Sequence, residues 1–247
     1  MKLKFKSIIL YIILFISFNF LESCSLDEYN PGGFTMEAMS TSEEGYQTLI
    51  NQCYFAMERY FYGSDNWMTL TEADTDLWTY QRNMSTSWTQ WFWYFAGAAP
   101  NTTYTNNWWN GTYDGIGSCN TAIFYADKVP FKTEQERNAK VAEARFLRAV
   151  YYFNAVEQFG GVTKSISFKP ERSDPLTVYE EIIIPDLLFA FEWLGKGTDA
   201  TTTIPTKKSA LGFLAKAYLQ TIAHDETKKY AADALKYAKM LIDDAEA

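Results

Sequence analysis

The chain has a single histidine, His224, among 247 residues, and its three cysteines show no CxxC spacing. Histidine and cysteine are common ligands of protein-bound zinc and common bases and nucleophiles in enzymes. A hydrolytic triad needs a partnered histidine on a rigid scaffold, whereas His224 falls in an expected turn between two helices. The sequence therefore argues against a zinc site, a catalytic metal site and a Ser–His–Asp or Cys–His mechanism, and it predicts no cofactor.

An excess of basic side chains is also lacking. Residues 24–247 hold 19 Lys and Arg against 29 Asp and Glu, a net charge near −10. Proteins that bind nucleic acid need a basic face to neutralise phosphates, and peripheral docking on anionic lipid needs basic clusters. Nucleic acid and an anionic lipid surface are thus excluded as main binding partners.

The apolar run near the N-terminus is too short to span a bilayer. Residues 8–21 form this run of 14, with Ser17 and Asn19 as its polar members, whereas a spanning helix needs about 20. Lys2, Lys4 and Lys6 precede it. A basic start followed by a short apolar core is typical of a secretory signal peptide, predicted here at residues 1–23.

Cys24 follows this segment directly. Leu21 at −3, Ser23 at −1 and Cys24 at +1 form the pattern of a bacterial lipobox, although Glu22 is unusual at −2. Several acyl chains on Cys24 would hold the protein on a membrane, since each buried CH₂ contributes about 0.8 kcal/mol. The alternative is an ordinary signal peptide with a chance cysteine. The other two, Cys53 and Cys119, are expected either to form one disulfide or to be free and buried.

Residues 133–245 are predicted to be a series of regular helices. The first begins at a Thr133–Glu136 capping box and ends at Gly160. The second begins at Asp174 and Pro175, runs to residue 194, and should kink or split at Pro185. Two more are expected at about 206–222 and 226–243.

The last two predicted helices carry small residues at helical spacing. Ala231, Leu235 and Ala238 form one such stripe, and the preceding helix carries Ala210, Gly212, Ala215 and Ala217. Small residues allow two antiparallel helices to pack closely. A helix–turn–helix unit of roughly 34 residues is typical of a tetratricopeptide-type repeat.

Residues 34–128 are rich in Trp, Tyr, Thr and Asn. Helices are predicted at about 42–60, capped by Ser42, and at about 105–128, with a less regular stretch at 62–100. No low-complexity linker separates the halves, so residues 24–247 are expected to form one domain. The predicted fold class is all-α, with tetratricopeptide-like helix pairs and an irregular aromatic-rich loop region.

Five segments in order resemble one family. They are the lipobox, the pattern Trp109–Tyr113–Ile116–Asn120, the run AEARFLRAVYYFNAVEQFGGV at 142–162, and two later runs at 178–194 and 204–220. Together they resemble the SusD/RagB family of Bacteroidetes outer-membrane lipoproteins. Members of that family are usually about twice this length, so this chain is expected to correspond to their N-terminal half.

The resemblance implies a location, a partner and a function. It implies a lipid-anchored protein on the cell surface that covers a SusC-type TonB-dependent transporter. It also implies a protein that binds glycans and carries out no chemistry on them.

The candidate glycan site lies in the aromatic stretch. A sugar ring packs its C–H face on Trp or Tyr, and its hydroxyls need fixed polar partners. Residues 72–97 combine both kinds of side chain, and the family commonly uses this region for ligand contacts. The candidate contacts are Asp74, Asp76, Trp78, Arg82, Asn83 and Trp88. Tyr80, which lies between them in the sequence, belongs to the same mixture of aromatic and polar side chains.

Other aromatic and basic residues are expected to have structural roles. Trp109 belongs to a helical stripe and should pack in the core. Arg145 and Arg148 are expected to pair with acids such as Glu143 or Asp186 inside the helix stack.

Two other functions remain as alternatives. A glycoside hydrolase needs two carboxylates about 5–9.5 Å apart, for which Glu72, Asp74 and Asp76 qualify by type. A helix-repeat protein that binds peptides would use residues 133–245 instead.

Overall fold

The computed structural model describes residues 35, 39, 41–62, 71, 103–164, 170–197 and 203–246. The chain divides into two units, Met1–Thr35 and Met36–Ala247, and the description below concerns the second. Its regular structure is helical, apart from an isolated antiparallel bridge between Val162 and Ser173 in the same described ranges. The predicted all-α class is confirmed. No helix in these ranges is both long enough and apolar enough to cross a membrane.

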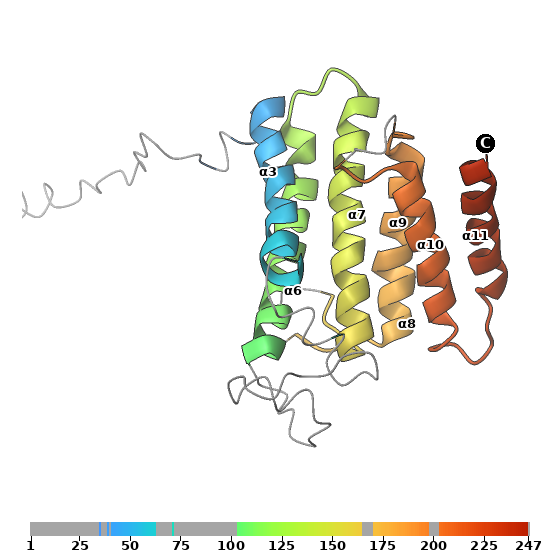
Figure 1. Cartoon of the computed structure of the whole chain (residues 1–247). Helices are drawn as coiled ribbons and strands as arrows, with labels where there is room; N and C mark the ends of the chain where they lie inside the picture. The colour runs from blue at the N-terminus through green and yellow to red at the C-terminus, as the bar shows by residue number, and fades with distance from the viewer. Residues whose placement is uncertain are drawn as a thin grey trace, which may run out of the picture. The chain divides into compact units, whose positions relative to one another are not determined.

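The helices follow one another as neighbours in space (Figure 1). Each of the long helices packs against its neighbours in the chain, as in the predicted stack of helix pairs. Their order is α3 (Glu43–Ala56), the π-helix η1 (Met57–Tyr62), α6 (Thr103–Tyr125), the 3₁₀ turn η2 (Ala126–Lys128), α7 (Glu134–Phe159), α8 (Pro175–Val178), the π-helix η3 (Tyr179–Ile183), α9 (Ile184–Trp193), α10 (Lys207–Thr221) and α11 (Ala231–Glu246).

Helix ends agree with the signals in the sequence. The hydroxyl of Ser42 accepts from the Gly45 amide at 3.0 Å, that of Thr133 from the Glu136 amide at 3.1 Å, and the Asp174 carboxylate from the Leu176 amide at 2.9 Å. Each such cap stabilises a helix by about 1 kcal/mol. Gly160 ends α7 with φ of 69°, a conformation that a side chain would disfavour.

Pro185 interrupts the regular α-helical hydrogen bonding of the predicted second helix, as expected. Pro185 lies in the first turn of α9, which follows directly on the π-helix η3. The preceding π-helix η3 widens the turn, so that the Ile184 amide donates to the Tyr179 carbonyl five residues back. The chain thereby continues in nearly one helical path despite the proline.

The predicted start of the last helix at residue 226 is wrong, because α11 begins at Ala231. The side chain of Asp225 accepts from the amide and hydroxyl of Thr227, at 3.0 and 2.6 Å, and from the Lys229 amide at 3.2 Å. Lys228 adopts a left-handed φ of 52°. These local bonds hold residues 225–229 in a turn that competes with the helix.

The predicted contact stripe of this helix is also wrong. Ala231 and Leu235 are exposed, and Leu235 leaves 57% of its surface in solvent. The buried positions are Ala234 and Tyr237, and the ring of Tyr237 stacks on Tyr218 of α10 with centroids 5.4 Å apart and planes 2° apart. A large tyrosine pair therefore determines the packed face of α11 and overrides the stripe of small residues.

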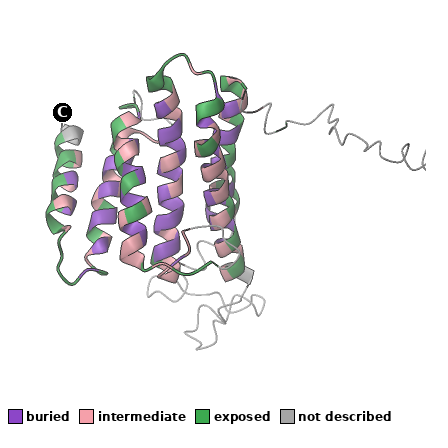
Figure 2. Cartoon of the chain, turned by 180° about the vertical axis from the view of Figure 1, so that it is seen from behind, coloured by how far each residue is buried: buried purple, intermediate pink, exposed green. Residues whose placement is uncertain are grey.

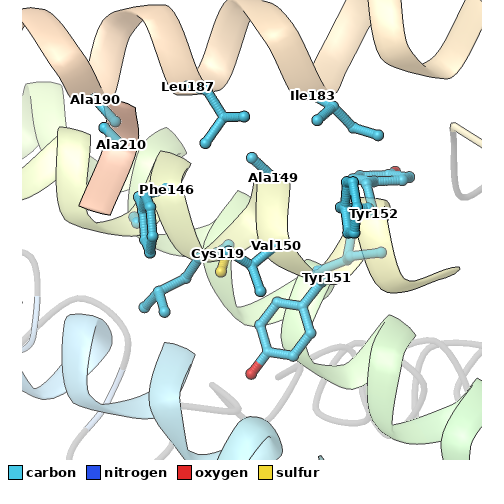
Figure 3. Close-up of a cluster of buried hydrophobic side chains, with 14 of the residues drawn as sticks. Cys119, Phe146, Ala149, Val150, Tyr151, Tyr152, Ile183, Leu187, Ala190 and Ala210 are labelled. Atoms are coloured by element: carbon cyan, nitrogen blue, oxygen red, sulfur yellow. The ribbon is translucent and has the colours of Figure 1, made fainter. Parts of the chain in front are cut away.

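α7 lies at the centre of the core, and Figure 2 shows buried residues along most of its length. Figure 3 shows its two opposite sides: Leu187 and Ile183 approach Ala149 from one side, and Cys119 lies on the other. All four are at most 1% exposed. Burying side chains of the size of Leu187 and Ile183 contributes roughly 1.5–3 kcal/mol each, so α7 is the helix on which the others depend.

One buried ion pair links three of the helices. Arg148 of α7 donates through Nε to Asp186 Oδ2 at 2.6 Å and through a second nitrogen to Oδ1 at 2.8 Å. A third bond runs from Arg148 to Asn120 Oδ1 of α6 at 2.7 Å. Asp186 of α9 is 2% exposed. Burial raises the pKa of its carboxyl, and the bonds from Arg148 and the nearby Arg145 oppose that rise. The predicted pairing of these two arginines with Asp186 is confirmed.

We expect Asp186→Ala to lower the free energy of unfolding by about 3–5 kcal/mol, because it leaves the largely buried Arg148 without its counter-charge. Urea unfolding followed by circular dichroism measures the loss. Asp243→Ala, an exposed change on α11, is the control and should alter stability by less than about 0.5 kcal/mol.

The double variant Arg148→Met with Asp186→Leu should recover most of that loss, because an apolar pair of similar volume needs no compensating charge. If Asp186→Ala unfolds at the wild-type urea concentration, the pair does not hold the helices together.

Candidate functional site

The predicted glycan contacts lie outside the described residues. This applies to Asp74, Asp76, Trp78, Tyr80, Arg82, Asn83 and Trp88, to Glu72, and to the predicted lipid attachment site Cys24. The structure does describe the helices on either side of the aromatic segment, which leaves η1 at Tyr62 and returns at Thr103 in α6.

An aromatic core joins these two points. The Phe61 ring lies 4.6 Å from Trp108 of α6 and 5.6 Å from Tyr151 of α7, measured between centroids. Phe61 and Trp108 are each 1% exposed. A Cβ on Gly111 would lie 2.3 Å from the Tyr60 ring, so η1 can pack on α6 only because glycine stands there. Both ends of segment 63–102 are thus attached to one rigid part of the fold.

A second aromatic group, partly exposed, lies further along α6. The Trp109 ring is 4.8 Å from Tyr113 and 5.1 Å from Phe159 of α7, and the Arg172 guanidinium lies 5.9 Å from its centroid. The Tyr113 hydroxyl donates to the Thr163 carbonyl at 3.0 Å. Trp109 is half-buried and packs against the core, as predicted. The neighbouring Trp108 is the more deeply buried of the two.

Each residue of the Trp109–Tyr113–Ile116–Asn120 pattern on α6 therefore has a structural role. Trp109 and Tyr113 hold the end of α7 and the loop after it, Ile116 is 1% exposed in the core, and Asn120 accepts from Arg148. Spacings of three and four residues place all four on one side of the helix.

Partly buried tyrosine–glutamate bonds add further links between helices. Tyr54 of α3 donates to Glu143 of α7 at 2.6 Å, and Tyr179 donates to Glu157 at 2.6 Å. Burial raises the pKa of both tyrosines, and the carboxylate that accepts each bond raises it further. Both hydroxyls therefore stay protonated and act as fixed donors.

His224 lies where the sequence places it, exposed in the turn between α10 and α11. Its ring stacks on Tyr179, with centroids 6.1 Å apart and planes 28° apart. The contact is one of packing between the turn and η3. Within the described ranges, no group of three His, Cys, Asp or Glu side chains is placed to hold a metal ion.

Cys53 and Cys119 are free and fully buried, which decides between the two alternatives for these residues. Cys53 donates to the Leu49 carbonyl at 3.3 Å. Burial raises the pKa of the Cys119 thiol well above its usual value, and a hydrogen bond with Cys53 raises it further. Neither thiol exposes surface, so both are shielded from reagents in the folded protein.

The helices described above define a class: an α-helical stack of consecutive helix pairs. The sequence then identifies the family. Residues 34–219 match the family described as "Starch-binding associating with outer membrane". The chain belongs to this SusD-like family, which confirms the resemblance seen in the sequence.

Individual SusD-like proteins resemble this chain in sequence or in fold. SusD-like protein P2 of Formosa agariphila is 35% identical over 123 residues, which are 45% of this chain and 23% of that protein. A SusD homolog of Bacteroides thetaiotaomicron has the same fold with a TM-score of 0.70 at 22% identity, over 85% of this chain and 43% of that one. A laminarin-binding SusD-like protein gives 0.64 at 24% identity, over 79% and 43%. This chain thus spans less than half the length of these relatives.

Cysteine labelling tests the burial of the two thiols. In the Cys24→Ala chain we expect a maleimide to leave Cys53 and Cys119 unmodified while the protein is folded, because neither exposes surface. After denaturation without reductant, mass spectrometry should show two additions. Additions that appear only once reductant is present would reveal a disulfide instead of free thiols.

Proposed function

We propose that this protein is a glycan-binding lipoprotein of the outer membrane, which captures oligosaccharide or polysaccharide for a SusC-like TonB-dependent transporter. The observation that carries the proposal is the family match over residues 34–219, which spans the whole aromatic segment. The names of relatives support it, since one solved neighbour binds laminarin and another was solved with a xylogluco-oligosaccharide.

The proposed mechanism is capture without chemistry. Trp78 and Trp88 offer ring faces to the C–H face of a sugar, and Asp74, Asp76, Arg82 and Asn83 bond its hydroxyls. The aromatic core of Phe61 and Trp108 supports this role, because it holds both ends of the segment on rigid helices. A site whose ends are already ordered loses less entropy on binding.

The proposed location follows from the N-terminal sequence. Residues 1–23 act as the leader, Cys24 carries the lipid, and residues 24–247 form the helical domain. The acidic charge of that domain disfavours direct contact with an anionic bilayer, so the lipid supplies the attachment.

Affinity electrophoresis of residues 25–247 tests the proposal. The panel should contain starch, laminarin and xyloglucan, together with host and microbial polysaccharides, and circular dichroism should verify that the chain is folded. Retardation by a glycan supports capture and identifies the substrate class. A folded chain that no glycan retards, and that depolymerises one of them, would point to a glycoside hydrolase.

Trp78→Ala and Trp88→Ala should each weaken retention by the best glycan about fivefold to tenfold, because each removes one stacking face. Phe124→Ala removes an exposed aromatic ring of α6 (67% exposed) outside the segment and should change nothing. Equal retention of both tryptophan variants and wild type would remove Trp78 and Trp88 from the site.

Cys24→Ala should release the protein from the membrane, because the thiol that carries the acyl chains is gone. Fractionation of cells expressing each form measures the effect, with Cys53→Ala as the matched cysteine control. A Cys24→Ala protein that still sediments with outer membranes would show that another part of the chain provides the attachment.

A further inference from the structure

A cavity of about 440 Å³ opens at the end of the helix stack where α6 ends, α7 begins and α9 ends. Its size falls in the range of small-molecule sites, roughly 300–1,000 Å³. The side chains that matter for its chemistry are Arg137, Asn138, Arg145, Phe189, Glu192 and Trp193. None of them belongs to the aromatic segment 63–102.

Two aromatic rings form one wall. Phe189 and Trp193 are one turn apart on α9, with centroids 6.2 Å apart and planes inclined by 36°. Both are half-buried, so each ring is held by the core and still offers part of its surface to the cavity. Two adjacent ring surfaces suit a ligand with an apolar face.

Arg145 lies beside these rings, and the described residues do not use all of its hydrogen-bond donors. Its guanidinium carbon lies 4.2 Å from the Phe189 centroid, which fixes the group by a cation–π contact. Its Nε lies 3.8 Å from Asp186 Oδ1, too far for a hydrogen bond. Asp186 already accepts two bonds from Arg148. The buried Nε of Arg145 has no hydrogen-bond partner among the described residues.

Arg137 lines the same cavity but donates hydrogen bonds to neighbouring side chains through each of its nitrogens. It donates to Asp127 at 2.7 Å and to Asn138 Oδ1 at 3.1 and 3.2 Å. Its charge is therefore neutralised within the wall. Arg145 shares its one carboxylate with Arg148 and is 31% exposed, so its outer nitrogens remain the donors that a ligand can use.

The charge of the lining narrows the ligand class. Asp127, Glu134 and Glu192 line the cavity together with the two arginines, so an anionic ligand would meet an excess of carboxylates. Hydroxyl groups both donate and accept, so they can bond to Arg145 and to Glu192. A neutral ligand with one C–H face and a rim of hydroxyls satisfies all of these conditions.

From this geometry we propose that the cavity is a second saccharide site, which takes one neutral pyranose unit of a glycan chain. The C–H face of the sugar packs on Trp193 and Phe189, and its hydroxyls bond to Arg145 and Glu192. The proposal rests on the proposed function, since it assumes that this protein meets glycans. Two sites at different places on one chain would retain a polymer more strongly than either alone.

Fluorine NMR separates the two sites. The full chain, purified from membranes in detergent and labelled with 5-fluorotryptophan, is titrated with maltose, cellobiose, laminaribiose and xylobiose. The Trp193 resonance is assigned from Trp193→Phe. We expect at least one disaccharide to shift it, and Arg145→Gln to weaken that binding about tenfold, whereas Phe124→Ala leaves it unchanged. The resonance of the buried Trp108 reports that each variant is folded.

Other results would overturn the proposal. If disaccharides shift Trp78 or Trp88 and never Trp193, the cavity is not a saccharide site, while the proposed function stands. The same holds if polysaccharides retard the chain and no disaccharide shifts Trp193. If neither polymer nor disaccharide binds, both proposals fail. A Trp193 shift that Arg145→Gln leaves at wild-type affinity would remove Arg145 from the site and refute the geometry proposed here.

Discussion

The ion pair of Arg148 and Asp186, with Asn120 as third member, is the interaction on which the rest of the helix stack depends. These three side chains lie on α7, α9 and α6, so the bonds of Arg148 connect both α9 and α6 to α7. The desolvation of a buried pair is offset only when its geometry is good and its remaining donors are bonded. Here the carboxylate accepts two bonds and the guanidinium donates three. The register of three helices is therefore specified together.

Hydrogen bonds from tyrosine hydroxyls also connect the helices and turns around α7. Tyr46 of α3 donates to the Ala122 carbonyl of α6 at 2.8 Å, and Tyr151 of α7 donates to the Cys53 carbonyl of α3 at 2.7 Å. Tyr230 reaches Glu180 at 2.7 Å and ties the last turn to η3. The buried hydroxyls of Tyr46 and Tyr151 are each satisfied by a carbonyl of another helix. Apolar packing supplies most of the stability, and these bonds select one arrangement of the helices.

The hydrogen bonds of Asp186 also explain why Arg145 keeps a donor that the described residues do not use. Asp186 can satisfy Arg148 fully or share its bonds between two arginines, and the short distances to Arg148 show that the first arrangement is adopted. Arg145, one turn earlier, is left with an ion pair at 3.8 Å and a ring beneath it. The same constraint that fixes the core thus leaves a charged group at the edge of a cavity.

The sequence by itself determined the helical class, the caps at Ser42, Thr133 and Asp174, and the interruption at Pro185. These features depend on local hydrogen bonds or on strong periodicity, both of which are encoded in a few neighbouring residues. Tertiary structure decided the rest. The start and packed face of α11 follow from Asp225 and from the stacking of Tyr237 on Tyr218, and the cavity at Arg145 exists because residues of α6, α7 and α9 meet there. Such contacts join residues that are far apart in the chain, so spacing along one helix cannot reveal them.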